Sequence, residues 1–228
     1  MAESTEKIYL AELIVDFGID KNVNVEQALL QIQSNYRIIE FSTDHFLQYL
    51  SKNKNNFSDI FLKWTEMSHQ ILFNNILNNA GKYRNSSDKG GGIVLYGPEV
   101  FRNPSGSKFK GIPADNIPAQ MESLFTLLSS NDANPIYTAI KFYQQFVFIH
   151  PFYDRNGRIA RFLVTIYLLY HGYYIEWKKL EGTKKNKFLK KLNESHLRLH
   201  TNSYDEYLGY LYKFWKTFVL EHETLEGE

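Results

Sequence analysis

The spacing of hydrophobic residues along the chain predicts a protein built mostly from helices. Between residues 57 and 77 the apolar side chains recur three or four positions apart, as on one face of a helix: Ile60, Phe61, Trp64, Met67, Ile71 and Phe73. A second stripe follows Asn134 and Pro135, an N-cap residue and a first-turn proline. It ends at His150, because the next residue is a proline, which disfavours helical geometry at the position before it.

The next predicted helix is the most apolar of the chain. It runs from about Asn156 to Tyr170 and closes at Gly172, since glycine is favoured just beyond a helix end. Beyond its first turn almost no polar face remains, as its apolar positions show: Ile159, Phe162, Leu163, Ile166, Tyr167 and Tyr170. We therefore expect this helix to lie at the centre of the core.

The remaining segments complete an all-α pattern with one small β element. Residues 7–80 carry helical stripes separated by polar breaks, and helical patterns return at residues 119–128 and 184–225. Between residues 81 and 118 the chain is rich in Gly, Pro, Ser and Asn around the β-prone run Ile93 to Tyr96. This composition predicts a β-hairpin inside an otherwise helical fold.

Composition restricts the possible functions. The 228 residues include 26 Lys and Arg against 25 Asp and Glu, so no global positive field favours a nucleic acid or an anionic membrane as partner. Cysteine is absent, which excludes disulfides, thiol catalysis and thiolate metal sites. The amino-terminal residues lack a secretory pattern and no later run resembles a spanning helix. We expect a cytoplasmic protein with no membrane or nucleic-acid partner.

One segment, HPFYDRNGRIAR from His150 to Arg161, concentrates the chemistry. His150 lies where a helix ends, and an imidazole is the side chain best suited to take a proton from a hydroxyl near neutral pH. Asp154 offers a hard oxygen ligand for Mg²⁺, which binds through one or two carboxylates together with substrate phosphates. The segment therefore combines a candidate base with a candidate metal ligand.

The second half of the segment suits a bound anion. Asn156 and Gly157 lead into a helix whose first N–H groups have no partners within the helix and can bind phosphate. Arg158 and Arg161 lie three residues apart on one face, where their guanidinium groups could bind phosphate oxygens. Two arginines oppose the helix dipole at this end, which an anion would compensate.

Each of these side chains also has an ordinary structural interpretation. His150 could be a buried, hydrogen-bonded histidine, and Asp154 could be a turn or N-cap residue. Arg158 and Arg161 could be solvated residues of a helix face or partners of nearby carboxylates. Their order and spacing at one helix entrance favour the functional interpretation.

The segment resembles the Fic family signature HPFx(D/E)GNGRxxR at every diagnostic position except one. Residues 81–84, Gly-Lys-Tyr-Arg, also resemble the family's glycine-to-arginine stretch before its β-hairpin flap. The resemblance implies a Fic-type helical bundle with a small β-hairpin flap. It divides the chain into an N-terminal helical layer (1–59), a Fic-like catalytic core (60–215) and a C-terminal helix end that could be inhibitory (216–228).

The resemblance further implies a protein adenylyltransferase that uses Mg²⁺ and takes AMP from ATP. His150 would deprotonate a Ser, Thr or Tyr hydroxyl of a target protein, and Asp154 would hold Mg²⁺ on the α and β phosphates. The amides near Asn156 and Gly157 would form the anion hole. Arg158 and Arg161 would hold the outer phosphates.

The departure from the signature is Arg155, where the family usually has glycine. If the turn required a positive φ, an arginine would be strained there. We favour the alternative, in which the backbone amide still serves and the side chain adds a cation near the phosphates, because Gly157 is retained at the tighter point before the helix. A phosphotransferase subclass of the family has lysine at the position of Gly157, so glycine there favours nucleotidyl transfer.

Three further features are weaker. The run Ile93 to Tyr96 could offer a strand edge to a target segment, or be an ordinary surface hairpin. Thr217, Glu221 and His222 loosely resemble the family's inhibitory (S/T)xxxE(G/N) helix, in which the glutamate pairs with the last arginine of the motif, here Arg161; a solvated helix face is the alternative. Two histidines four apart lack the glutamate of a zinc peptidase and are interpreted as surface residues: His196 and His200.

Two alternatives to AMP transfer to a protein remain. The chain could be a catalytically weak nucleotide-binding protein in which Arg155 or the C-terminal helix holds the site closed. It could also transfer another phosphate-linked group, such as UMP or phosphocholine.

Overall fold

The helices predicted from the hydrophobic stripes are present in the computed structural model, which describes residues 25–74, 76–88, 90–96, 109–129, 134–180 and 183–221. The α-helices are α2 Val25–Lys52, α3 Phe57–Phe73, α4 Ile117–Ser129, α5 Pro135–Ile149, α6 Asn156–Tyr170, α7 Thr183–Leu197 and α8 Tyr204–Lys216. Short 3-10 turns are η1 Lys54–Asn56, η2 Ala114–Asn116 and η3 Trp177–Leu180. The all-α fold class is therefore confirmed.

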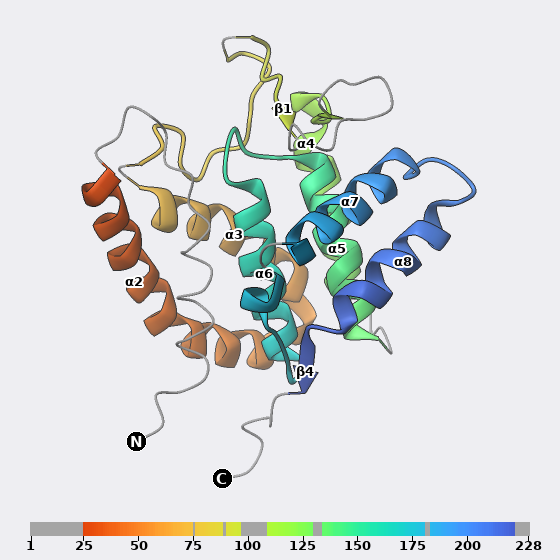
Figure 1. Ribbon diagram of the computed structural model, residues 1–228. Helices are drawn as coiled ribbons and strands as arrows, with labels where there is room; N and C mark the ends of the chain where they lie inside the picture. The colour runs from red at the N-terminus through yellow and green to blue at the C-terminus, as the bar shows by residue number, and fades with distance from the viewer. Residues whose placement is uncertain are drawn as a thin grey trace.

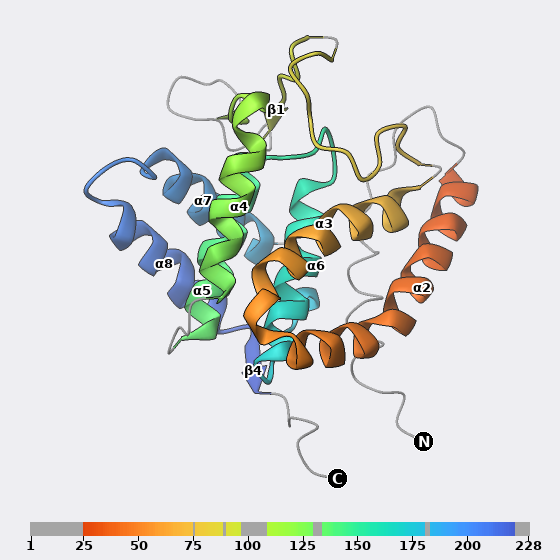
Figure 2. The same ribbon diagram turned by 180° about the vertical axis from the view of Figure 1, so that it is seen from behind.

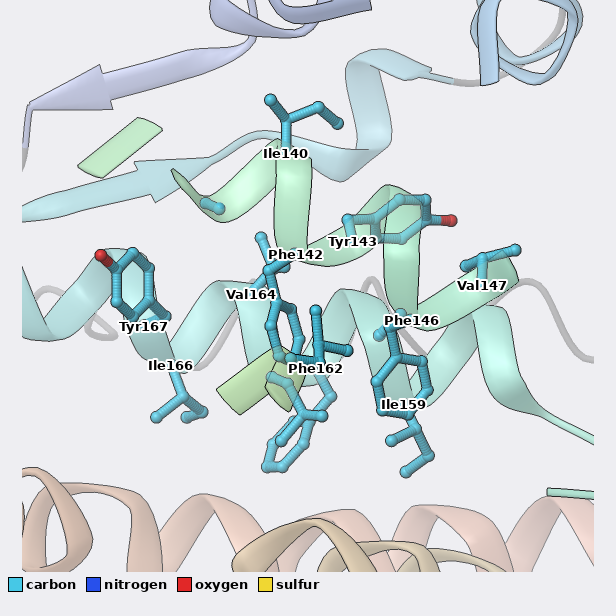
Figure 3. Packing of buried hydrophobic residues seen from close by; sticks show 14 of the residues in the cluster. Ile140, Phe142, Tyr143, Phe146, Val147, Ile159, Phe162, Val164, Ile166 and Tyr167 are labelled. Carbon is cyan, nitrogen blue, oxygen red and sulfur yellow. The ribbon is translucent and has the colours of Figure 1, made fainter. Parts of the chain in front are cut away.

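Helix α6 is the centre of the core, as its apolar sequence predicts. It packs against α5, α3 and α2, and it lies between α3 and α5 in Figure 1. Figure 3 shows Phe142 and Phe146 of α5 directed toward α6, where Ile159 and Phe162 are also fully buried. Burying each such side chain stabilises the fold by about 1.5–3 kcal/mol.

The predicted ends of α5 and α6 are confirmed. The Asn134 side chain accepts a hydrogen bond from the amide of Tyr137 at 3.0 Å, so it caps α5, and Pro135 occupies the first turn. After α6 the chain turns at Gly172, whose φ of +76° is the left-handed geometry that glycine allows. Helix α3 is shorter than its hydrophobic pattern suggested and ends at Phe73.

Helix α2 shares this core with the helices that follow it. Phe46 stacks on Trp64 of α3 with ring centroids 4.3 Å apart, and the Asn35 side-chain amide donates to the carbonyl of Leu72 at 3.1 Å. The described part of the N-terminal layer therefore packs as one body with α3. Among the helices of the described ranges, none has the length and apolar character needed to cross a bilayer.

Two short antiparallel strand pairs complete the fold. Strands β1 Leu95–Tyr96 and β2 Phe109–Lys110 pair with Tyr96 opposite Phe109, as expected for the flap hairpin, whose connecting residues 97–108 lie outside the described ranges. The second pair, β3 Tyr173–Ile175 with β4 Val219–Glu221, was not predicted. The expected C-terminal helix end is wrong for residues 219–221, because this segment satisfies the backbone groups of β3 as a strand.

The proposed contact between Glu221 and Arg161 is also wrong. Glu221 lies opposite Tyr173, which follows the last turn of α6, whereas Arg161 lies in the second turn, about 13 Å along the helix axis from Tyr170. Figures 1 and 2 show β1 and β4 at opposite ends of the molecule. Of the other two members of this candidate motif, Thr217 is the C-cap of α8 and His222 lies outside the described residues.

His196 is buried, so its interpretation as a surface residue is wrong. It lies on the inner face of α7, is 4% exposed, and its Nε2 donates to the carbonyl of Gln144 on α5 at 2.8 Å. Burial disfavours the charged imidazolium and lowers the pKa of His196 to about 4. His200, one turn further on, is exposed as predicted.

Between pH 6.5 and 4 His196 is expected to make folding stability depend on pH. In this window the unfolded chain protonates His196 while the folded chain does not, so the free energy of unfolding falls by about 1.4 kcal/mol per pH unit as the pH decreases. Urea denaturation at pH 7, 6 and 5 measures this slope. In His196→Gln the slope should shrink by that amount, and in His200→Gln it should not; equal slopes in both variants would contradict the assignment.

Candidate functional site

A pocket of about 350 Å³ opens at the N-terminal end of α6. All of the site residues predicted from the sequence line it: His150, Asp154, Arg155, Asn156, Gly157, Arg158 and Arg161. The rest of its lining comes from α5, η3 and α7 and was not predicted: Tyr143, Trp177, Lys178, Leu180, Lys185, Phe188 and Leu189. The structure therefore brings the whole motif to one cavity and adds a second, lysine-bearing and aromatic wall.

The loop between α5 and α6 is held by its own side chains. The Asn156 side chain accepts from the amide of Phe152 and donates to the carbonyl of Phe152, both at 2.8 Å. Phe152 is fully buried and stacks on His69, with ring centroids 3.9 Å apart. The side chain of Asn156 is therefore committed to the loop, so only its backbone amide can face a ligand.

The first two amides of α6 differ from the two that follow them. Within the described residues no backbone carbonyl accepts a hydrogen bond from the amides of Asn156 or Gly157, whereas those of Arg158 and Ile159 donate to the carbonyl of Arg155. A Cβ added at Gly157 would meet only the Tyr143 hydroxyl, at 3.9 Å. The first two amides of α6 are therefore placed to bind an anion.

His150 has the protonation state of a base. It ends α5 in the left-handed conformation, with φ +54°, and its Nδ1 lies 3.1 Å from the carbonyl of Val147. Because a carbonyl only accepts, Nδ1 carries the proton and Nε2 keeps its lone pair. Burial lowers the pKa of His150 to about 4, so the imidazole is neutral at physiological pH. Nε2 can therefore take up a proton from a substrate hydroxyl.

Asp154 offers one accessible carboxylate. Its side chain is 51% exposed; Oδ1 accepts from the amide of Arg155 at 2.7 Å, and Oδ2 lies 3.5 Å from Nη1 of Arg155. Among the residues with described positions, no group of three or more acidic or histidine side chains could hold a metal ion. A Mg²⁺ ion fits this donor set only if phosphate oxygens and water supply its other ligands, which is how it commonly binds at nucleotide sites.

Arg155 corrects the interpretation drawn from the sequence. Its φ of +63° and ψ of +15° are left-handed, so the turn does require a positive φ and the arginine is strained, at a cost of about 1–2 kcal/mol. The residue serves as the N-cap of α6 and reverses the chain so that the helix can begin directly after it. Its side chain is 12% exposed and lines the pocket beside Asp154.

Arg155→Gly is expected to be more stable than Arg155→Ala by about 1 kcal/mol. Both variants lose the ion pair with Asp154, but only alanine keeps a Cβ that is strained at positive φ. Chemical denaturation measures the difference. The same pair of substitutions at Glu122, an exposed residue inside α4, should give the opposite order, because glycine is unfavourable within a helix. If the glycine variant were the more stable one at both positions, or at neither, the result would contradict backbone strain at Arg155.

Arg158 and Arg161 both face the pocket from α6. The guanidinium carbon of Arg161 lies 5.8 Å from the centre of the Trp177 ring, a cation–π distance. Trp177 is fixed in turn by a 2.9 Å hydrogen bond from its indole N–H to Thr165, one turn beyond Arg161. Helix α6 therefore positions the two arginines and also Trp177, an aromatic residue of the second wall.

Arg84 joins the flap to the end of α5. Its guanidinium donates to the carbonyl of His150 at 2.7 Å and to that of Ile149 at 3.2 Å. It also donates to the carbonyl of Ile112 at 2.9 Å and to that of Gly92. The glycine-to-arginine stretch therefore holds the segments on both sides of the flap against the residue that carries the base.

Sequence reasoning missed the second wall. Its signal was a run of lysines from Lys178 to Lys187 that lies between two aromatic residues, Trp177 and Phe188. Such runs are common on solvated helix faces, so the sequence did not separate Lys178 and Lys185, which line the pocket, from the other lysines. Only the packing of α7 against α5 makes this distinction.

Comparison with known proteins identifies the family. The sequence profile of the Fic/DOC family matches residues 59–168. A Fic domain containing signaling protein from Bacteroides thetaiotaomicron has a similar structure, with 18% identity over 90% of this chain and 76% of that chain and a TM-score of 0.58.

The N-terminal Fic domain of a cell filamentation protein from Bartonella quintana, a VirB-translocated effector, gives 14% identity over 85% of this chain and 88% of that chain, with a TM-score of 0.52. At these identities the two structures show a shared fold. No curated protein sequence matches the chain. This chain therefore carries a domain of the Fic/DOC family over residues 59–168.

Proposed function

We propose that this protein transfers AMP from ATP to a Ser, Thr or Tyr hydroxyl of a target protein. The observation that carries the proposal is a neutral imidazole with an available Nε2, in one pocket with a carboxylate, two arginines and two helix amides that donate to no backbone carbonyl of the described residues. This set matches what an in-line displacement at a phosphate requires, namely a base and positive charge at the phosphate oxygens.

In the proposed reaction the target hydroxyl oxygen attacks the α-phosphorus of ATP and its proton passes to Nε2 of His150. A phosphoester bond forms to the target, the bond to the β-phosphate breaks, and pyrophosphate leaves. The amides of Asn156 and Gly157 stabilise charge on the α-phosphate, and Arg158 and Arg161 hold the leaving phosphates. Asp154 is the residue that would hold Mg²⁺, which supplies further positive charge to the phosphate oxygens.

Three observations support a nucleotide as the donor. The Fic domain from Bartonella quintana that shares this fold was solved with bound ADP. The second wall of the pocket combines Trp177 and Phe188 with Lys178 and Lys185, so it offers apolar surface to a base and cations to phosphates. The glycine at position 157 leaves the space in front of the helix open to a phosphate.

We also propose that β1 is where the target segment docks. Leu95 on this strand is 61% exposed and Ile93, two residues before it, is 56% exposed, whereas Tyr96 is turned inward. An extended target segment adding to this edge would be held by backbone hydrogen bonds and would present its hydroxyl near His150.

A second candidate function is nucleotide binding without transfer. It is favoured by one contact, the 3.5 Å ion pair between Arg155 and the Asp154 carboxylate. This guanidinium pairs with the carboxylate that would otherwise bind Mg²⁺. In this case the protein would bind ATP and release it unchanged.

The deciding experiment incubates the protein, with and without a bait protein, with ATP and Mg²⁺ and reads intact mass. We expect an adduct of AMP size, label from the α-phosphate and none from the γ-phosphate. ATP binding detected by calorimetry without any adduct would favour the second candidate, and label from the γ-phosphate would show phosphorylation instead. Parallel reactions with the other nucleoside triphosphates identify the preferred base.

A further inference from the structure

The flap packs an aromatic ring directly on the candidate base. The ring of Tyr96 lies parallel to the imidazole of His150, with centroids 4.3 Å apart and an interplanar angle of 11°. Tyr96 is only 9% exposed, although it lies on a two-residue strand whose neighbour Leu95 is 61% exposed. Strand alternation therefore directs Tyr96 inward onto His150 and Leu95 outward to solvent.

Tyr96 is itself wedged in place. Its cross-strand partner Phe109 stacks behind it, with centroids 5.6 Å apart and an interplanar angle of 24°. The buried ring of His196 packs edge-on against both aromatic rings, at 6.1 Å from Tyr96 and 5.9 Å from Phe109. The Tyr96 ring is therefore confined between His150 on one side and the side chains of β2 and α7 on the other.

The flap cannot draw back from His150 without breaking several contacts. Arg84 donates to carbonyls on both sides of the flap, at Gly92 and Ile112, and to the carbonyl of His150. At Gly111, which follows β2, an added Cβ would come within 2.9 Å of Nη2 of Arg84 and 3.3 Å of Cβ of His150. This close approach holds the backbone that follows β2 against Arg84 and His150.

The hydrogen bond from Nδ1 of His150 to Val147 does not by itself fix the plane of the imidazole. The ring can still turn about its Cβ–Cγ bond while this contact stretches, and Nε2 then changes its position relative to the pocket. A flat ring packed on one face of the imidazole blocks this rotation. Proton transfer needs Nε2 within hydrogen-bond distance of the attacking hydroxyl, so a small rotation of the ring lowers the rate of AMP transfer.

The ring of Tyr96, and not its hydroxyl, supplies this restraint. The Tyr96 hydroxyl is buried and has no hydrogen-bond partner in the described part of the chain. A buried hydroxyl without a partner does not stabilise the fold, so its loss should be neutral or favourable. Phenylalanine at this position should therefore preserve the restraint on His150. Leucine, which fills space without a flat face, should not preserve it.

We propose that Tyr96 is a positioning residue for His150: its ring, stacked on the imidazole, holds the base in the orientation that presents Nε2 to the pocket. The part of this proposal that concerns rate rests on the proposed function. The part that concerns the imidazole does not, since the geometry of His150 can be measured without any substrate.

The test uses nitrogen and carbon NMR of the His150 ring in the wild type and in Tyr96→Phe, Tyr96→Leu and Leu95→Ala. Wild type, Tyr96→Phe and Leu95→Ala should show one tautomer, protonated at Nδ1, and the same low pKa. Tyr96→Leu should show mixed tautomers and a pKa raised by roughly one unit or more toward its usual value of about 6.5, because water reaches the exposed ring face. The charged groups nearest the ring, Arg84 and Asp154, are unchanged in all four proteins.

Rates provide the second readout. Tyr96→Leu should lower kcat for AMP transfer about 10- to 100-fold with KM for ATP within about two-fold, and Tyr96→Phe should keep both near wild type. A wild-type tautomer and pKa in Tyr96→Leu would overturn the proposal whether or not the protein transfers AMP. If no form of the protein transfers AMP but the NMR changes occur, the proposed function fails and the positioning of His150 by Tyr96 stands.

Discussion

His150→Ala is expected to lower AMP transfer by about 10²–10⁴-fold while ATP affinity stays within about two-fold. The loss follows because Nε2 of His150 is the only proton acceptor assigned to the target hydroxyl, and Nδ1 is already committed to Val147. Binding should persist because the arginines and helix amides that hold the phosphates come from α6 and not from α5. Calorimetry with ATP and single-turnover labelling separate the two effects.

The pH dependence sharpens this test. Since burial lowers the pKa of His150 to about 4, the base is already neutral at pH 6, and the wild-type rate should change little between pH 6 and 9 through this group. It should fall as the pH approaches 4, where the imidazole becomes protonated. In His150→Ala, raising the pH to 9 should not restore the rate to the wild-type level.

Two control variants guard against structural damage at position 150. Because this residue has φ +54°, alanine is strained there and asparagine is better tolerated, so His150→Asn tests the loss of the base with less strain. His171→Ala removes a histidine that follows the last turn of α6, far from the pocket, and should keep the rate. Full activity of His150→Asn would contradict the assignment of the base. Equal losses of rate in His150→Ala and His171→Ala would also contradict it.

Arg84→Met is expected to reduce the free energy of unfolding by about 3–5 kcal/mol. The guanidinium of this 3% exposed residue donates to four carbonyls, those of Gly92, Ile112, Ile149 and His150. Methionine has a similar length and no donor, so buried carbonyls would lose their partners. Each such loss costs about 1–3 kcal/mol, reduced where water can enter.

Urea denaturation at pH 7 measures this effect, with Lys82→Met as the matched control. Lys82 lies two residues earlier and is exposed, so its substitution should change stability by less than about 0.5 kcal/mol. Arg84→Lys should recover only part of the loss, because an ammonium cannot reach four separated acceptors in the plane of a guanidinium. A loss below 1 kcal/mol in Arg84→Met would show that Arg84 does not hold the flap.

Helices α5 and α6 were predictable because their signals are local. Asn134, Pro135 and Gly172 stand at positions where a side chain or backbone geometry favours a helix start or end regardless of the rest of the fold. The gathering of His150 to Arg161 at one pocket was also predictable, because a short loop and the first turns of one helix leave these residues little freedom to separate. The roles assigned to them stay predictions until the variants are measured.

The errors made from the sequence have a different origin. His196 was interpreted as a surface residue, but the docking of α7 on α5 buries it. Glu221 was placed on a helix beside Arg161, but pairing with β3 makes its segment a strand. Arg155 was interpreted as unstrained, but the loop geometry imposes a positive φ. In each case a partner distant in the sequence, or the backbone path between two packed helices, outweighs local preference.

The sequence by itself determined the central helix, the caps of its neighbour and the contiguous set of groups at its entrance, because these depend on contacts between residues a few positions apart. Only the tertiary structure decided which lysines and aromatic residues form the facing wall, where the C-terminal strand lies, and that the Tyr96 ring covers His150. These features depend on surfaces brought together from segments up to 54 residues apart, as for Tyr96 and His150. The hydrophobic effect that joins such surfaces is non-directional. Packing, and not local pattern, selects those neighbours.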